Sequence, residues 1–385
     1  MAREWVRAGH RVQIVAASFS HIRAIQPEMD VVILDENIEG VDYRWYPTPQ
    51  YQGNGIGRVK NMLGFLWVLW RDAKRIAQEF KPNIVIASST YPMDIWPAHH
   101  ISKLSNAKLV FEMHDLWPLS PMELGGLSKW HPFILWVRMA ESYVYRHAEK
   151  IVSILPKTLS YMKSRGMQEH KFAYVPNGIN EEEWVQPTPL PSEVQSQIDR
   201  LRLQALPIVG YAGTYGLANA LDVLLDAAHE LKNKALIILV GTGPDHDRLV
   251  GRTIKEELTN VTILASIPKQ SIPNFLAAVD IAYIGWHPNP LYRFGISPNK
   301  LMDYMMAGKP IVHSVRAGND PVAEAGCGIT VEPGDASAIA EAVLSLASLS
   351  EGERIKIGLA GKEFILKNQT YRVLAKLFLT KIINT

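Results

Sequence analysis

The sequence has one cysteine, no long apolar run and almost no excess of charge of either sign over its 385 residues. The single cysteine, Cys327, excludes a disulfide framework or a multi-cysteine metal site within one chain, and it favours a reducing, cytoplasmic setting. The longest apolar run worth testing, residues 62–70, is much shorter than the ~20 residues that span a bilayer. The first residues also lack the apolar core and cleavage site of a signal peptide. We therefore expect neither a transmembrane helix nor secretion.

The charges of the chain nearly cancel. Forty lysines and arginines stand against 38 aspartates and glutamates, which gives a formal net charge of +2. A dedicated nucleic-acid-binding protein is expected to be strongly basic. We therefore predict no nucleic-acid partner, and we expect any bound nucleotide to be small.

Short runs of β-branched residues alternate with amphipathic stretches along the chain, which is 47% hydrophobic. This alternation is typical of βαβ units and of a parallel sheet covered on both faces. Two series of strands are predicted, at 11–16, 83–87, 108–112, 150–154 and 171–175, and at 207–212, 235–240, 261–264, 281–284 and 310–314.

A proline-rich segment separates the two series. Residues 186–195 hold three prolines within five positions, which break regular structure. We therefore predict an α/β protein of two Rossmann-like, doubly wound domains. The expected bounds are 1–185 for the N-terminal domain, 186–206 for a linker, 207–362 for the second domain, and 363–385 for terminal helices whose docking site the sequence leaves open.

The first residues have the pattern of a helix end, not of an opening strand. Residues 3–8, Gly9 and residues 11–16 read as the end of a helix, its glycine stop and the next strand. A doubly wound domain normally opens one strand earlier, with a central strand whose following loop approaches the ligand. We therefore expect the first strand of the N-terminal domain to be missing from this sequence.

Residues 294–312 carry the signals of one short helix that begins with a candidate anion site. Ser297 suits the N-cap, Pro298 suits the first helical position, and Gly308 ends the helix.

Backbone N–H groups at residues 297–299, including Asn299, and the charge of Lys300 would hold a phosphate there. Asp303 would accept hydrogen bonds from ribose or sugar hydroxyls. A capped surface helix with a solvated lysine and aspartate fits the same residues.

Glycine-containing turns follow two strands of the second series. Gly213, Thr214 and Gly216 form the first turn, and Gly241 and Gly243 belong to the second. Such glycines let the backbone approach a ligand, and Thr214 adds a hydroxyl, although an ordinary tight βα turn has the same composition. Together with the helix at Lys300 they predict a nucleotide cleft at the carboxyl edge of the sheet.

These segments together resemble the retaining GT-B glycosyltransferases of family 4, in particular the bacterial surface-polysaccharide branch related to L-fucosamine transferases. The resemblance covers nearly the whole chain and is carried by the segments at 9–15, 114–118, 175–180, 213–218 and 297–310.

The resemblance implies two domains facing a central cleft and transfer of a sugar, with retention, from a nucleotide diphosphate. The expected donor is a UDP-linked N-acetylated sugar, and the expected acceptor is a lipid-linked or glycan molecule of O-antigen or capsule synthesis. The nucleotide sugar is then a substrate, and neither a cofactor nor a metal is expected.

The chain departs from the general family pattern at the donor site. Of the family's two glutamates eight positions apart, the second aligns with Asp303 and the first with Gly295. The bases that clamp the diphosphate elsewhere are absent between Tyr215 and Ala220, so Lys300 is expected to supply that charge. The acceptor proton is expected to leave with the departing phosphate, so no catalytic carboxylate pair is required, and the lack of one disfavours a glycoside hydrolase.

The resemblance also assigns a role to His114, at the end of the strand predicted at 108–112. A family histidine near the donor sugar would orient the donor or relay a proton. The alternative is a partly buried histidine bonded to backbone. Asp115 would orient His114 or cap the following turn, and Asp115 and Trp117 are assigned to the acceptor side.

Asp245 and Asp247 have the Asp-x-Asp form of metal-dependent glycosyltransferases. They stand at a predicted helix start, where aspartate is favoured by the helix dipole in any case. We predict no metal at this motif.

Residues 58–75 and 129–138 mix tryptophans and apolar side chains with basic ones. Such stretches fit the inner face of an anionic membrane, where a lipid-linked acceptor would be found. Amphipathic helices packed on the sheet fit them equally.

Two other functions agree with parts of this pattern. The missing first strand and the lost first glutamate fit a non-catalytic or partner GT-B protein. A hydrolysing UDP-sugar 2-epimerase shares the fold, but it needs acid and base side chains converging on the sugar, and no motif marks them.

Overall fold

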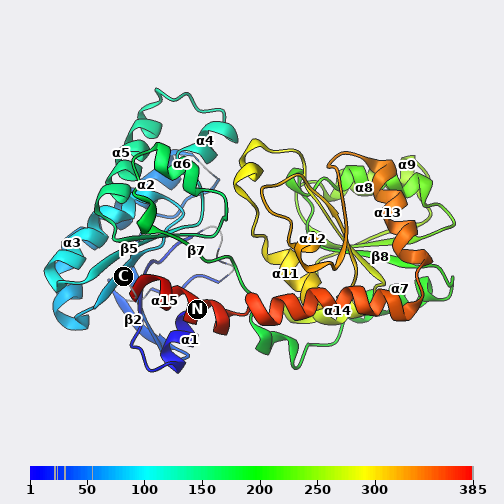
Figure 1. Cartoon of the computed structure of the whole chain (residues 1–385), viewed down its shortest axis with the longest axis horizontal. Helices are drawn as coiled ribbons and strands as arrows, with labels where there is room; N and C mark the ends of the chain where they lie inside the picture. The colour runs from blue at the N-terminus through cyan, green and yellow to red at the C-terminus, as the bar shows by residue number, and fades with distance from the viewer. Residues whose placement is uncertain (21–22, 24, 30–31, 54, 384–385) are drawn as a thin grey trace. The chain divides into compact units, whose positions relative to one another are not determined.

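The computed structural model describes residues 1–20, 23, 25–29, 32–53 and 55–383, and its chain divides into two compact units (Figure 1). The N-terminal unit comprises Met1–Ile154, Thr158–Val175 and Leu374–Thr385. The C-terminal unit comprises Leu155–Lys157 and Pro176–Val373.

The N-terminal unit contains two sheets. Strands β1 and β3 pair in parallel and β2 pairs antiparallel to β3, in the order β1-β3-β2, whereas β4-β5-β6-β7 form a parallel sheet. Among the described residues, β1 and β4 each pair on one edge alone. The strands are β1 (Gln13–Ala17), β2 (Leu34–Ile38), β3 (Val41–Tyr46), β4 (Ile84–Ala87), β5 (Lys108–Met113), β6 (Lys150–Ser153) and β7 (Phe172–Tyr174).

Helices cover both faces of these strands. The long helix α2 packs its apolar side with α3 against β3 and β4, and α15 packs on β5 and β6. The helices of this unit are α1 (Ala2–Arg7), α2 (Ile56–Phe80), η1 (Pro92–Asp94), α3 (Ile95–Ser105), α4 (Leu119–Glu123), α5 (Pro132–His147), α6 (Leu159–Ser164), η2 (Glu169–Lys171) and α15 (Tyr371–Ile383).

The C-terminal unit is built on one parallel sheet in the order β10-β9-β8-β11-β12-β13. Its inner strands are apolar and buried on both faces, as expected of parallel strands between two helix layers. The strands are β8 (Ile208–Thr214), β9 (Leu236–Thr242), β10 (Val261–Leu264), β11 (Ile281–Gly285), β12 (Ile311–Ser314) and β13 (Gly328–Val331).

One face of this sheet packs against α7, α10, α11 and α14, and the other face packs against α8, α9 and α13. The helices are η3 (Glu181–Trp184), α7 (Ser192–Arg202), η4 (Leu217–Asn219), α8 (Leu221–Glu230), α9 (His246–Lys255), η5 (Lys269–Ser271), α10 (Ile272–Ala277), η6 (Pro290–Phe294), α11 (Asn299–Met306), α12 (Pro321–Ala325), α13 (Ala336–Ser348) and α14 (Glu351–Asn368).

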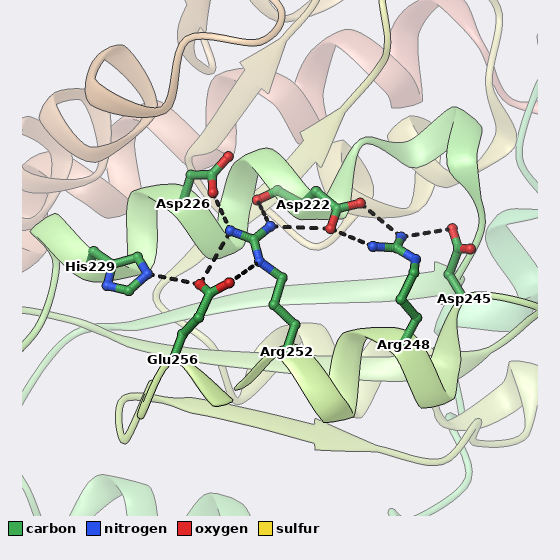
Figure 2. A network of polar contacts seen from close by, with 7 residues as sticks. All are labelled: Asp222, Asp226, His229, Asp245, Arg248, Arg252 and Glu256. Atoms are coloured by element: carbon green, nitrogen blue, oxygen red, sulfur yellow. Dashed lines mark hydrogen bonds and ion pairs between the residues drawn. The ribbon is translucent and has the colours of Figure 1, made fainter. Parts of the chain in front are cut away.

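Helices α8 and α9 are joined by a network of charged side chains (Figure 2). Arg248 donates to both carboxylate oxygens of Asp222, at 2.6 and 2.8 Å. Arg252 contacts Asp222, Asp226 and Glu256. Because α8 and α9 directly follow the two glycine turns of the sequence, the network ties together the elements that carry those turns.

Every predicted strand is present, with ends shifted by two residues at most. Three strands were not predicted: β2, β3 and β13. In β2 four of the five side chains are exposed, so the strand has no apolar alternation that a sequence pattern could detect.

The structure shows where the C-terminal helix packs, which the sequence left open. Helix α15 packs on the N-terminal unit, where the Phe378 ring lies 5.2 Å from that of Trp5, and Trp5 Nε1 donates to the carbonyl of Ala375 at 3.0 Å. In the described part of the chain, no helix combines the length and the apolar character needed to cross a membrane.

Candidate functional site

Lys300, in the first turn of α11, is the centre of the candidate site in the C-terminal unit. Its Nζ donates to the hydroxyl of Tyr211 at 2.7 Å and to Oδ1 of Asn219 at 2.8 Å. The ammonium also lies 4.2 Å from the centroid of the Tyr211 ring, a distance typical of a cation–π contact. Three separate elements, α11, β8 and η4, therefore fix the position of this cation.

The hydrogen bonds around Lys300 are consistent with one another. The carbonyl of Thr214 accepts from the Tyr211 hydroxyl at 2.7 Å and from Asn219 Nδ2 at 3.0 Å. Both partner side chains thus turn their hydrogens toward Thr214 and their oxygen lone pairs toward Lys300. Two of the three N–H groups of the ammonium are used in this way, which leaves the third for a ligand.

Among the described residues no carboxylate pairs with Lys300. Burial lowers the pKa of its ammonium from 10.5 to about 7, because the charged form has lost water and gained no counter-charge. A bound anion would supply that counter-charge. The arrangement is therefore chemically suited to an anionic ligand.

The glycine turns pack tightly beneath Lys300. A Cβ on Gly213 would lie 2.5 Å from Lys300 Cε, so the lysine occupies the space that this glycine leaves open. A Cβ on Gly241 would lie 1.8 Å from the carbonyl oxygen of Gly213, and one on Gly243 would lie 2.2 Å from that of Tyr215. Packing of one turn on the other thus accounts for Gly241 and Gly243, while around Gly216 the nearest atom would be 3.8 Å away.

The start of α11 differs from the sequence prediction. Pro298, not Ser297, occupies the N-cap, and Asn299 is the first helical residue. The Ser297 hydroxyl accepts instead from the backbone N–H of Asn177 at 2.9 Å, and its carbonyl accepts from Asn177 Nδ2 at 2.7 Å. The expected row of N–H donors at 297–299 is also interrupted, because proline has no N–H.

A second asparagine fixes the same loop. Asn319 Oδ1 accepts from the backbone N–H of Ile296 at 2.7 Å, and Asn319 Nδ2 donates to the Ile296 carbonyl at 3.1 Å. The backbone N–H groups of Asn299 and Lys300 donate to no acceptor in the described part of the chain and remain available at the helix start.

Asp303 lies one turn beyond Lys300, but its charged neighbours are different. Burial raises the pKa of its carboxyl to about 6, although the charge of Lys269 acts in the opposite direction. Lys269 itself pairs with Glu183 at 2.6 Å. Asp303 thus stands apart from the Tyr211 and Asn219 contacts, with no hydrogen bond to its carboxylate among the described residues.

In the N-terminal unit, His114 directly follows β5. Its imidazole contacts other side chains, whereas the alternative given above expected a hydrogen bond to the backbone. Its Nε2 lies 3.1 Å from the Ser88 hydroxyl and 3.5 Å from Glu112 Oε2. Burial would lower the pKa of the imidazole, but the carboxylates of Glu112, Asp115 and Asp94 together outweigh this effect and the pKa is raised.

Asp115 and Trp117 lie beside His114 along the chain and line the same small cavity with it. The Asp115 side chain makes no hydrogen bond in the described residues, so it neither holds His114 nor caps the turn, and it acts on His114 through its charge. The Trp117 ring packs edge to face on Phe133, with centroids 5.7 Å apart.

The aspartates of the Asp-x-Asp pattern do not converge. Asp245 pairs with Arg248 at 3.4 Å, and Asp247 contacts His246 at 2.8 Å with its side chain fully exposed. Within the described ranges, no group of three or more His, Cys, Asp or Glu side chains is arranged to hold a metal ion.

Six residues that contact the candidate site residues or their loops were not predicted from the sequence: Tyr211, Asn219, Asn177, Asn319, Ser88 and Glu112. Tyr211 and Asn219 are 89 and 81 residues from Lys300, a separation that no local pattern spans. Glu112 carried one available signal, because in a strand it lies on the same face as residue 114.

Two family models match the chain. The glycosyl transferase 4-like domain matches residues 1–178, and the glycosyl transferases group 1 model matches residues 206–348. The chain is also 23% identical over 246 residues to a probable glycosyltransferase, WbjE, of Pseudomonas aeruginosa. That match covers 63% of this chain and 60% of the relative.

Solved structures share the fold over nearly the whole chain. Sucrose-phosphate synthase from Thermosynechococcus elongatus matches with a TM-score of 0.71 at 17% identity, over 98% of this chain and 89% of that one. HepE of Anabaena, solved with UDP and glucose, matches with a TM-score of 0.64 at 16% identity, over 90% and 87%. With both family models and this fold, the chain belongs to the GT-B glycosyltransferases.

Proposed function

We propose that this glycosyltransferase moves a sugar, with retention, from a nucleotide diphosphate to a lipid-linked or glycan acceptor of cell-surface polysaccharide synthesis. The observation that carries the proposal is the half-buried ammonium of Lys300, which has two neutral hydrogen-bond partners and, within the residues that the structure describes, no acidic one. Such a cation needs an anion, and a diphosphate is the anion that a glycosyltransferase donor provides.

The proposed chemistry places the donor diphosphate against Lys300 and the backbone N–H groups of Asn299 and Lys300, which find no acceptor among the described residues at the start of α11. Negative charge grows on the diphosphate as the sugar leaves, so these donors stabilise the transition state more than the ground state. Asp303 is proposed to accept hydrogen bonds from ribose or sugar hydroxyls. His114 is proposed to orient the donor sugar, and no metal is assigned to the reaction.

UDP is the proposed nucleotide, with an N-acetylated sugar. Two observations support UDP. HepE, which shares the fold, was solved with UDP, and the segments around Lys300 resemble a branch that uses such donors.

An NMR assay tests the proposal. The full chain is incubated with a panel of UDP-sugars and GDP-sugars, with and without glycan and lipid-linked acceptors. We expect UDP and a new glycoside with the anomeric configuration of the donor. Release of UDP with a free 2-epimer would instead identify a hydrolysing epimerase, and no turnover of any donor would favour a non-catalytic protein.

We further propose that the N-terminal unit contacts an anionic membrane surface through α2 and the turn that precedes α5. Both α2 and α5 bury an apolar side, as expected of amphipathic helices packed on the sheet. Trp67 and Trp70 of α2 nevertheless remain 58 and 52% exposed, and Trp130, in the turn before α5, remains 70% exposed. The guanidinium of Arg71 lies 4.5 Å from the ring centroid of Trp67. Exposed tryptophans beside basic residues suit the interface of a bilayer.

Sedimentation with vesicles tests this contact. We expect the chain to pellet with vesicles rich in phosphatidylserine, and the double variant Trp67→Ser, Trp70→Ser to bind less. Leu203→Ser with Ile254→Ser is the matched control, since both are exposed apolar residues of the C-terminal unit. Equal binding by the two double variants, or none by the unaltered chain, would refute the proposal.

A further inference from the structure

Ser88, Glu112 and His114 form a chain of contacts at the carboxyl ends of β4 and β5. The Ser88 hydroxyl lies 2.5 Å from Glu112 Oε2 and 3.1 Å from His114 Nε2. Glu112 Oε2 is also 3.5 Å from the same imidazole nitrogen. The side chain of Glu112 is 13% exposed and that of His114 is 34% exposed, so the histidine reaches the surface and the carboxylate lies beneath it.

The direction of these hydrogen bonds follows from the groups themselves. An ionised carboxylate can only accept, so the Ser88 hydroxyl donates its one hydrogen to Glu112. The Ser88 oxygen then has only lone pairs to offer, and His114 Nε2 must carry the hydrogen that lies between them. In the neutral imidazole the other nitrogen, Nδ1, is consequently a bare acceptor, and among the described residues it has no hydrogen-bond partner.

We propose that Glu112, together with Ser88, is a positioning residue that fixes the Nε2–H tautomer of His114 and presents Nδ1 to a hydroxyl group of the donor sugar. The inference rests on the proposed function for the identity of that hydroxyl group. The inference goes beyond the proposed function because it assigns the choice of the His114 tautomer to the Glu112 carboxylate. An aspartate has the same role toward the histidine of a hydrolase triad.

The charges around His114 are mostly negative. Glu112, Asp115 and Asp94 all raise the pKa of the imidazole, against its burial. Burial alone would raise the pKa of Glu112, but the contacts with His114 and Ser88 act in the opposite direction and the pKa is lowered, so the carboxyl stays ionised. Arg58 acts on Asp115 from α2. Replacing Glu112 by glutamine keeps the shape and removes the nearest of these charges.

Nitrogen-15 NMR of the full chain tests the tautomer directly, with the His114→Gln variant identifying the His114 signals. We expect Nε2 protonated and Nδ1 bare above the imidazole pKa. Ser88→Ala should lower the fraction of this tautomer, and Glu112→Gln should lower the His114 pKa, because it removes the carboxylate that raises it most. Glu169→Gln, which removes an exposed ion pair with Lys163 in the same unit, should change neither.

Turnover supplies the second readout. If neutral Nδ1 accepts a hydrogen bond from the substrate, activity falls where His114 becomes protonated, so the acid limb of the pH profile should move to lower pH in Glu112→Gln. A hydrogen on Nδ1 of the neutral imidazole in the unaltered chain, or an unchanged His114 pKa in Glu112→Gln, would overturn the inference. The expected NMR result without transfer of any sugar would instead overturn the proposed function, because the tautomer is measured without substrate.

Discussion

At the scale of single residues, the proposed nucleotide site depends on Lys300. The pKa of its free ammonium is about 7, and a bound diphosphate would raise it by supplying the missing counter-charge. Nucleotide binding should therefore take up a proton at neutral pH.

The sign of this linkage gives a pH prediction for UDP. Affinity is full where Lys300 is already charged, below its free pKa, and it should fall by up to about tenfold per pH unit as pH rises above about 7. Calorimetry at pH 8 in buffers of different ionisation enthalpy measures the protons taken up. Lys300→Met should abolish the uptake, and an unaltered chain that binds UDP without it would contradict the assignment.

Gly213 should matter through the space that it leaves for Lys300. In Gly213→Ala the new methyl group would stand 2.5 Å from Lys300 Cε and 2.7 Å from Nζ, so the flexible lysine end must move. We expect UDP affinity to fall about tenfold or more, the order of one lost charge-assisted hydrogen bond. Tm should fall as well, because Gly213 has a φ of +158°, a backbone conformation that residues with a side chain rarely adopt.

Gly251→Ala is the control, because a Cβ there meets no atom within 4 Å. It should leave UDP affinity unchanged and Tm equal or slightly higher. Equal UDP affinity in the Gly213 and Gly251 variants would show that Lys300 does not hold the nucleotide.

The sequence indicated Lys300 as a candidate site residue, but it did not indicate which side chains contact it. Lys300 stands out locally, since a base follows a proline at a helix start. Its neutral partners Tyr211 and Asn219 carry no such signal, because a tyrosine in a strand and an asparagine in a turn are ordinary. For Ser297 the local signal was misleading. Its residue type predicted an N-cap, but its hydroxyl accepts from the backbone N–H of Asn177, a contact that arises only in the folded chain.

At the scale of elements, the network between α8 and α9 should stabilise the helices that follow both glycine turns (Figure 2). Arg252 contacts three carboxylates, and its side chain is 20% exposed. We expect Arg252→Met to lower the free energy of unfolding by about 1 kcal/mol, with a smaller effect at high salt. Denaturant unfolding measures the change.

The network also has a defined pH dependence. Arg252, and after it His229, lowers the pKa of Glu256 from 4.5 to about 2. A carboxyl with a depressed pKa contributes stability above its unfolded pKa and loses it as the pH falls toward the folded one. The difference between the unaltered chain and Arg252→Met should therefore be constant near neutral pH and shrink below about 4.5.

Lys255→Met on the same helix is the control, since Lys255 is exposed and makes no ion pair in the described residues. Equal effects of the two substitutions, or a loss for Arg252→Met that does not change with salt or acid, would mean that the helices are held by apolar packing alone.

Elements were predictable where hydrophobic patterns are strong. The buried strands β8, β9 and β11 are continuous apolar runs between turns, and they stand where the sequence placed them. The exposed β2 and the short β13 have no such run. Their strand pairing depends on neighbours that a sequence pattern does not identify.

At the scale of the whole molecule, the order of strands and helices was enough to predict two α/β units, and the solved relatives share that architecture. The course of α15 could not be predicted. Its apolar residues Leu374, Phe378 and Ile382 follow a helical spacing, but their partners Val110 and Val152 lie far away in the sequence. The C-terminal helix thus completes the core of the N-terminal unit.

The central claim is that the C-terminal unit binds a nucleotide diphosphate through Lys300, and calorimetric titration with UDP at pH 7 tests it most directly. The full chain should bind UDP, Lys300→Met should bind about 10- to 100-fold more weakly, and Lys362→Met, a matched change on α14, should bind as the unaltered chain does. Unchanged affinity in Lys300→Met, or no binding of UDP by the unaltered chain, would contradict the account.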